Sequence, residues 1–221
     1  SWMVAGFVHG VLNTDNMNIS GESFDYGPWR WLPKWDPRFT AAYFDHGGLY
    51  AFGRQPESVL WNCGQLAVAL RMLTDTEPLI AALDRFGPLY QQAMARRFTW
   101  RLGVESRGLE ADSTLIQSAE RYMVEHEMAP DAFFFTHRGG RKADDDSFGE
   151  LLKGYAPAAD SSADFWQNDE SPHILIDEVE RIWAAIDADD DWTELHKKVS
   201  EIRELGRNLD EPPEPCGLRT I

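Results

Sequence analysis

The chain has 221 residues, enough for one domain with a sizeable core or for two small ones. Acidic residues outnumber basic ones by 37 to 21, and the formal charge of −16 argues against a nucleic-acid partner, because such a surface repels phosphate backbones. No apolar run approaches the roughly 18 to 20 residues of a membrane span, so no membrane partner is expected.

The cysteine content and the start of the chain bear on the compartment. Cys63 lies inside a helical pattern and Cys216 lies near the end, so no disulfide framework is expected and a reducing compartment fits. No basic segment precedes an apolar stretch, so no secretory signal is expected. We therefore expect a cytoplasmic protein, or a mitochondrial one if the source is eukaryotic. Because Ser1 is followed directly by apolar Trp2, with no initial methionine, we expect a piece of a longer protein.

The first segment, residues 1–56, differs in composition from the rest of the chain. It is rich in glycine, aromatic and turn residues and has few long periodic stretches, so the chemistry is expected here. Residues 17–20 alternate apolar and polar side chains, Gly21 and Glu22 can form a tight turn, and residues 23–24 resume a strand. This pattern predicts a short β-hairpin.

The predicted hairpin would bring two oxygen-bearing side chains together. Asn16 precedes its first strand and Asp25 follows its second, so the two positions become neighbours in space. An amide and a carboxylate that converge from adjacent strand ends form a hard oxygen site. Such a site suits Mg²⁺, which retains waters and takes its other ligands from phosphates. The sequence thus predicts a magnesium site at Asn16 and Asp25.

Beyond the first segment, helical patterns follow one another and predict a mainly α-helical body over residues 57–206. Gly87–Pro88 is predicted to end one helix, Asp112 to be the N-cap of another, and Ser171–Pro172 to start a third. The expected elements are helices at 57–73, 77–86 and 88–103, one after Asp112, one after Pro172, one from Trp192 to Gly206, and an irregular tail over 207–221.

The spacing around the hairpin matches the catalytic loop of protein-kinase-like enzymes. That loop reads His-x-Asp-x-x-x-x-Asn, and a second Asp follows after a short hairpin. His9 and Asn16 occupy the first and last positions, and Asp25 supplies the later carboxylate. The third position, where the usual catalytic base belongs, is Val11, which cannot accept a proton. Either the site is inactive or another carboxylate acts as the base, and Asp15 is the nearby candidate.

A longer run of residues resembles one protein family. The stretch His9–Met17, with Ile19–Gly21 and then Asp25–Pro28, is similar to the signature of the selenoprotein O family, also called YdiU or UPF0061. The resemblance is strong over residues 2–75 and fades into a general helical pattern beyond them. It continues through Asp36–Pro37, Gly53–Pro56, Trp61–Asn62 and Leu66–Ala67.

This resemblance implies both a fold and an activity. The fold would be the C-terminal lobe of a protein-kinase-like fold over residues 1–206, mainly α with a small β-hairpin at the metal site. Members of the family bind ATP in a reversed orientation and transfer AMP to Ser, Thr or Tyr hydroxyls of proteins. Carried over to this sequence, Asp15 is the proton acceptor, Asn16 and Asp25 hold Mg²⁺, with Mn²⁺ as a second candidate, and Asp25 also contacts ATP. His9 is expected to support the loop through hydrogen bonds.

Part of the family's nucleotide site has no counterpart here, and two other functions stay open. The Gly-rich segment, the Lys–Glu pair and the phosphate-binding arginines of the family precede this loop, so the absent N-terminal lobe of the same protein is an expected partner and the chain alone is expected to be inactive. One alternative is phosphoryl transfer by an atypical kinase. The other is a catalytically silent, pseudokinase-like binding module, which Val11 favours. Cys216 is either a regulatory thiol or an inert one.

Overall fold

The chain folds into two compact units, which are described separately. The computed structural model describes residues 1–143, 146–168, 170–209 and 211–213. The first unit comprises 1–30 and 36–94, and the second comprises 31–35 and the described residues from 95 onward. The division falls inside helix α4 (Phe86–Leu102). Cys216 lies outside the described residues, so its role stays a prediction.

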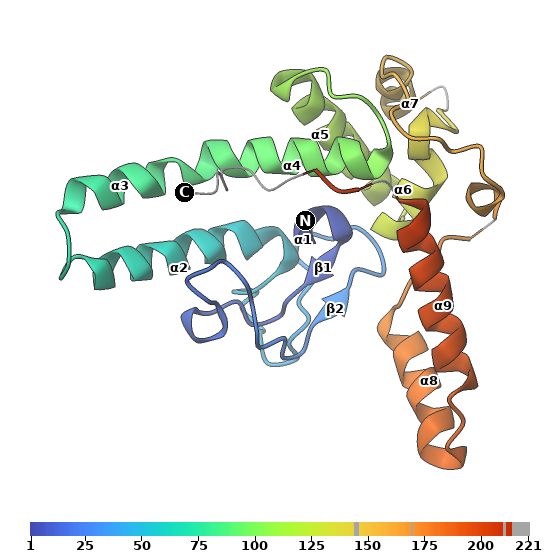
Figure 1. The fold of residues 1–221 in the computed structure, drawn as a ribbon, viewed down its shortest axis with the longest axis horizontal. Helices are drawn as coiled ribbons and strands as arrows, with labels where there is room; N and C mark the ends of the chain where they lie inside the picture. Colours follow the sequence, from blue (N-terminus) through green and yellow to red (C-terminus); the bar gives the residue numbers. More distant parts are fainter. Residues whose placement is uncertain (144–145, 169, 210, 214–221) are drawn as a thin grey trace. The chain divides into compact units, whose positions relative to one another are not determined.

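Helices make up most of the described chain, which confirms the prediction of a mainly helical protein (Figure 1). In the described part of the chain the sheet has two strands, β1 (Phe7–Val8) and β2 (Arg30–Trp31). This sheet was not predicted, because a strand of two residues is too short to show an alternating pattern. None of the helices in the described ranges combines the length and the hydrophobicity that a bilayer crossing requires.

The first unit contains the irregular N-terminal segment and two helices that lie side by side, α2 and α3 (Figure 1). The helices predicted at 57–73 and 77–86 are both present, with ends shifted by one to three residues. Gly87–Pro88, predicted to end a helix, lies instead in the first turn of α4, where a proline is tolerated because the first N–H groups of a helix have no helical acceptor. The elements of this unit are α1 (Trp2–Ala5), β1, the 3-10 turns η1 (Thr14–Asn16) and η2 (Phe52–Arg54), α2 (Gln55–Leu70), α3 (Thr76–Asp84) and the start of α4.

The predicted hairpin is present, although it is shorter than the sequence suggested. Met17 and Ser23 form an isolated antiparallel bridge, and the N–H of Asn18 donates to the carbonyl of Glu22 at 2.8 Å. The N–H of Gly21 donates to the carbonyl of Asn18 at 3.0 Å, so the turn is centred one or two residues before the predicted one. Gly21 has a φ of 89°, a conformation that a residue with a side chain rarely adopts. The hairpin therefore closes through its turn and one bridge, without regular strands.

Aromatic side chains fill the core of the second unit. The rings of Phe133 and Phe148 lie 5.1 Å apart, and those of Phe98 and Phe134 lie 4.9 Å apart. All four side chains are buried, and such tilted or edge-to-face pairs stabilise the core beyond the area they bury. The elements of this unit are the end of α4, α5 (Leu109–Glu125), α6 (Pro130–His137), η3 (Arg138–Gly140), α7 (Ser147–Leu152), η4 (Asp164–Gln167), α8 (Ile176–Asp189) and α9 (Thr193–Asn208).

Two helix boundaries in the second unit differ from the prediction. Helix α8 does not start at Ser171–Pro172 but at Ile176. The segment before it is non-helical, and the Nδ1 atom of His173 lies 3.3 Å from the Oε2 atom of Glu178, in the first turn of the helix. Helix α9 continues two residues beyond Gly206, which was predicted to end it, because a glycine inside a helix costs only about 1 kcal/mol.

Asp112 is not the N-cap that the sequence suggested. Helix α5 begins three residues earlier, at Leu109, so Asp112 lies in its first turn and is only 1% exposed. Its Oδ1 atom accepts hydrogen bonds from the N–H of Arg107 at 3.0 Å and from the hydroxyl of Tyr155 at 3.1 Å. Its Oδ2 atom accepts from the Oγ of Ser106 at 2.5 Å. The carboxylate thus joins the loop before α5 to the segment after α7.

The hydroxyl of Tyr155 should make stability depend on alkaline pH. Burial, and then the hydrogen bond to Asp112, raise the pKa of Tyr155 to about 12. The unfolded chain has a pKa of about 10, so the contribution to the free energy of unfolding is complete below about pH 10 and is lost as the pH rises to about 12. Urea unfolding measured between about pH 10 and pH 12 should show the free energy of unfolding fall in the wild type and in the exposed control Tyr43→Phe. This fall should be absent in Tyr155→Phe. Parallel pH profiles for all three proteins would contradict the assignment.

Candidate active site

The loop after β1 is built around a buried histidine, His9, which is fully buried. Its Nε2 atom lies 2.8 Å from the Oγ of Ser23, and that hydroxyl donates to the carbonyl of Asn16 at 2.8 Å. The N–H of Val11 donates to its Nδ1 atom at 3.4 Å. These partners require a neutral ring that carries its hydrogen on Nε2. The prediction that His9 supports the loop through hydrogen bonds is confirmed.

The charge state of His9 is set by two opposing effects. Burial lowers the pKa of His9 below its usual value, and the negative charge of Asp25 partly opposes this. The ring of Tyr26, the neighbour of Asp25, packs against the imidazole with 5.5 Å between ring centroids. The segment after the hairpin therefore returns to the histidine, which brings Asp25 to the same region of the loop.

Asn16 fixes the shape of the loop with its side-chain amide. It is the last residue of η1 and is 5% exposed. Its Oδ1 atom accepts from the N–H of Asn13 at 2.9 Å, and its Nδ2 atom donates to the carbonyl of Val11 at 2.7 Å. One lone pair of Oδ1 remains, since a carbonyl oxygen has two. Asn16 can therefore hold the loop and still offer an oxygen to a cation.

Asp15 and Asp25 are the two carboxylates that the sequence analysis assigned to the site, and both are exposed. Among the residues that the structure describes, no side chain forms an ion pair with either carboxylate. Ser23 links the two ends of the hairpin, because it bonds to the backbone of Asn16 and precedes Asp25 by two residues. The three predicted site residues thus lie on one hydrogen-bonded loop and hairpin, with both carboxylates open to a ligand.

The chemistry of these donors fits a magnesium ion. Asn16 and Asp25 offer an amide oxygen and a carboxylate, which are hard ligands, and Mg²⁺ takes one or two protein ligands together with phosphates and waters. Within the described ranges no group of three or more His, Cys, Asp or Glu side chains is arranged to hold a metal by itself. A cation at this site would therefore depend on ligands from its substrate.

Two buried amides of α2 hold the loop, and the sequence analysis assigned them no role. Gln55, 3% exposed, accepts from the N–H of His9 at 2.9 Å and donates to the carbonyl of Phe7 at 2.9 Å. Asn62, 7% exposed, donates to the carbonyl of Leu12 at 3.1 Å. Each amide thus acts as a substitute peptide group, because it pairs buried backbone groups of β1 and of the loop after it with a side chain of α2.

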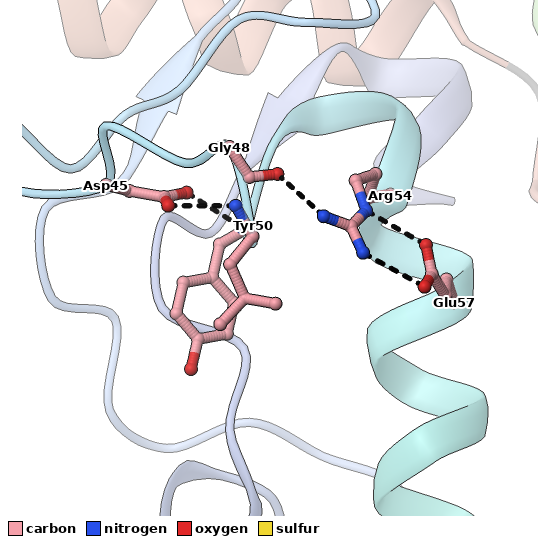
Figure 2. A network of polar contacts seen from close by, with 6 residues as sticks. Asp45, Gly48, Tyr50, Arg54 and Glu57 are labelled. Atoms are coloured by element: carbon pink, nitrogen blue, oxygen red, sulfur yellow. Dashed lines mark hydrogen bonds and ion pairs between the residues drawn. The ribbon is translucent and has the colours of Figure 1, made fainter.

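The segment that enters α2 is fixed by a polar network (Figure 2). The carboxylate of Asp45 accepts from the N–H groups of Leu49 and Tyr50, each at 2.8 Å. Arg54 donates to both oxygens of Glu57, at 2.9 and 3.0 Å, and to the carbonyl of Gly48 at 3.4 Å. Paired in this way, Arg54 orients the N-terminus of α2 and so places Gln55, the next residue.

Gly10 is required where the loop passes close to the side chains of Ala41 and Pro28. It has a φ of 88°, in the left-handed region that favours glycine. A Cβ atom at this position would lie 3.1 Å from the Cβ of Ala41 and 3.1 Å from the Cγ of Pro28. Both the backbone conformation and the contacts therefore select glycine between His9 and Val11.

Comparisons with known proteins identify relatives of the chain. Residues 1–168 match the family model described as protein adenylyltransferase SelO. A protein nucleotidyltransferase YdiU from Synechococcus sp. is 47% identical over 122 residues, which cover 54% of this chain and 25% of the relative. The YdiU of Gloeobacter violaceus is 31% identical over 230 residues, which cover 91% of this chain and 47% of the relative. The chain therefore spans no more than about half the length of either relative.

The buried amide of Gln55 should contribute strongly to stability. Gln55→Leu would leave the N–H of His9 and the carbonyl of Phe7 without partners, so we expect the free energy of unfolding to fall by about 2 to 4 kcal/mol. The matched control is Gln65→Leu, the same change at an exposed position of α2, which should change it by less than about 0.5 kcal/mol. Urea denaturation measures both values. Similar losses in the two variants would show that Gln55 does not hold the loop.

The protonation state of His9 can be observed directly. Nitrogen-15 NMR at pH 7.5 should show one histidine in the Nε2–H tautomer, and its pKa should lie below the ordinary value of about 6.5. Because this pKa is lowered in the folded state, the stability that it contributes is present above about pH 6.5 and is lost as the pH falls further. Ser23→Ala removes the partner of Nε2 and should alter that resonance. A ring that is protonated at pH 7.5 would overturn the arrangement.

Proposed function

Because the chain belongs to the SelO family, we propose that it takes part in the transfer of AMP from ATP to Ser, Thr or Tyr hydroxyls of proteins. The observation that carries the proposal is the loop in which Asn16 bonds to the backbone of Asn13 and Val11 and leaves the neighbouring Asp15 exposed. A fixed loop that presents a free carboxylate is what a general base requires.

Asp15 is the proposed proton acceptor. The acceptor hydroxyl attacks the α-phosphorus of ATP, a new O–P bond forms, and the bond between the α-phosphorus and the bridging oxygen of pyrophosphate breaks. The hydroxyl proton passes to Asp15, and pyrophosphate leaves with the electrons of the broken bond. Val11, at the usual position of the base in kinases, contributes its backbone carbonyl to Asn16 and takes no part in proton transfer.

Asn16 and Asp25 are the proposed magnesium ligands, with Mn²⁺ as the second candidate, and Asp25 also contacts ATP. The cation supplies charge neutralisation on the phosphates and on the departing pyrophosphate. The oxygen of Asn16 is held in place by the N–H of Asn13, so it needs no reorganisation to bind. Asp25 is exposed and follows the second arm of the hairpin, two residues after the bridge residue Ser23.

We further propose that this chain is the C-terminal lobe of a protein-kinase-like fold and that the rest of the nucleotide site comes from outside these 221 residues. The matched relatives extend well beyond the aligned region, as their coverage of 25% and 47% shows. The partners are then ATP, hydroxyl-bearing proteins and the N-terminal lobe, in a cytoplasmic or mitochondrial setting. The isolated chain is expected to bind ATP weakly and to be inactive.

Phosphoryl transfer by an atypical kinase is the second candidate. Val11 stands where kinases have their catalytic base and cannot accept a proton. Asp15 stands directly before Asn16 instead, so a base there would approach the nucleotide from a different direction, which favours chemistry at a different phosphorus. A catalytically silent binding module is the third candidate. The exposure of Asp15 and Asp25 argues against it, because a silent module has no need to keep two open carboxylates beside a rigid loop.

The mass added to an acceptor protein separates these candidates. We expect about 329 Da for AMP, against about 80 Da for a phosphoryl group, when the complete protein that carries this loop is incubated with Mg-ATP. Asp15→Asn should reduce the rate at least about 100-fold by removing the base, whereas Asp84→Asn, an exposed change on α3, should leave it unaltered. Asp25→Asn should abolish the metal dependence of nucleotide binding, measured by calorimetry.

Each candidate has a result that excludes it. Addition of about 80 Da would replace AMP transfer by phosphoryl transfer. Wild-type rates in Asp15→Asn would remove the assignment of the base. No addition to any protein, together with unchanged Mg-ATP binding in Asp25→Asn, would leave only the binding module.

A further inference from the structure

A groove runs between the hairpin and α2 within the first unit. Its volume is about 560 Å³, and it starts beside the proposed base, because Thr14 lines it and Asp15 is the next residue. The hairpin contributes an exposed apolar tip, Ile19, which is 81% exposed, and α2 contributes Trp61, which is 55% exposed.

A buried polar atom of a residue in the wall of the groove lacks a hydrogen-bond donor. Asn62 lines the groove and is 7% exposed, yet its Oδ1 atom accepts no hydrogen bond from the described residues. A buried amide oxygen without a donor costs about 1 to 3 kcal/mol, so such an atom usually has a partner. The partner must be an N–H or O–H donor.

The orientation of this amide is fixed by its other end. The Nδ2 atom of Asn62 donates to the carbonyl of Leu12 at 3.1 Å and lies 3.1 Å from the sulfur of Met17. Rotating the amide by a half turn would set its oxygen against two acceptors, which is unfavourable. The oxygen of Asn62 therefore stays the free atom.

The charges around the groove select the class of ligand. Among the described residues that line it there is no lysine or arginine, and two exposed acidic residues directly follow lining residues in the chain, Asp15 after Thr14 and Glu22 after Gly21. A phosphate group would find no cationic partner among these lining residues, so the groove itself suits a polypeptide better than a nucleotide. A polypeptide with basic side chains is attracted, and its backbone N–H groups are the donors that Asn62 lacks. Apolar side chains would pack on Ile19 and Trp61.

We propose that this groove binds the acceptor polypeptide of the transfer reaction. An extended segment donates a backbone N–H to the Oδ1 atom of Asn62 and places an apolar side chain between Ile19 and Trp61. Its basic side chains lie near the carboxylate of Glu22. Its hydroxyl then reaches Asp15 at the end of the groove. This inference rests on the proposed function, because it assigns the substrate segment of that same site.

A peptide library with a fixed central serine tests the proposal. The wild-type chain should retain peptides that carry apolar and basic residues beside the serine, and the best of them, labelled with fluorescein, provides an affinity by anisotropy. Ile19→Glu should weaken this affinity at least about tenfold, equivalent to about 1.4 kcal/mol. The matched control Ile80→Glu, the same change at a 52% exposed position of α3, should leave it unaltered. Trp61→Ala should weaken it without adding charge.

The hydrogen bond to Asn62 has a test of its own. Methylating the backbone nitrogens of the selected peptide one at a time removes one donor each time, and a single position should lose at least about tenfold in affinity. A peptide in which every methylated form binds equally would overturn the role of Asn62. No selection by the wild-type chain, or equal affinity for Ile19→Glu and Ile80→Glu, would overturn the groove as the acceptor site. Dimers that only Ile19→Glu dissociates, without peptide binding, would assign the groove to a second copy and overturn it too.

The failure of this inference can be told apart from that of the proposed function. In the complete protein, Ile19→Glu should raise the KM for the selected peptide and leave kcat for AMP transfer nearly unchanged. Transfer with an unchanged KM would overturn the groove and leave the activity standing. Peptide binding that Ile19→Glu abolishes, with no transfer of AMP to any acceptor, would support the groove and overturn the activity.

Discussion

The candidate site depends on the hydrogen bonds by which buried amides replace regular structure. The loop after β1 is irregular, so its buried N–H and C=O groups cannot pair within a helix or a sheet. Gln55 serves the N–H of His9 and also the carbonyl of Phe7 in β1, and Asn62 serves the carbonyl of Leu12. Because α2 is a rigid helix, the loop inherits its position, and the carboxylate of Asp15 is exposed at a defined place.

What the sequence could predict was local. The hairpin and the helical pattern depend on residues a few positions apart, where spacing carries the signal. The bonds of Gln55 and Asn62 span 46 to 50 residues, and nothing in the local pattern of a helix reveals which of its polar residues faces inward. The two-residue strands β1 and β2 were not predicted for a related reason, because strand pairing depends on two segments that are far apart in the sequence.

At Asp112 the sequence correctly indicated a carboxylate near the start of a helix, but it placed the first residue of that helix wrongly. An acidic residue before an apolar run is typical of an N-cap, and this carboxylate does accept a backbone N–H next to the start of α5. It does so from inside the first turn, because Tyr155 and Ser106 also require an acceptor there. Helix α5 begins three residues before Asp112, and the negative charge of Asp112 still lies near the N-terminus of the helix. Long-range partners thus decide which of several locally acceptable positions a helix adopts.

Asn62 connects the loop to the groove through the two ends of one amide. Its nitrogen is occupied by the carbonyl of Leu12, and its oxygen, in a side chain that lines the groove, has no donor among the described residues. A donor that binds the oxygen polarises the amide and strengthens the bond that the nitrogen makes, since hydrogen bonds in a chain reinforce one another. On the proposed function, an acceptor segment would therefore tighten the loop that carries Asp15 as it binds. Asp15 would then be held most firmly when the hydroxyl that it must deprotonate is present. Without an acceptor segment the loop would be less well ordered, so Asp15 would be a poorer base for a water molecule.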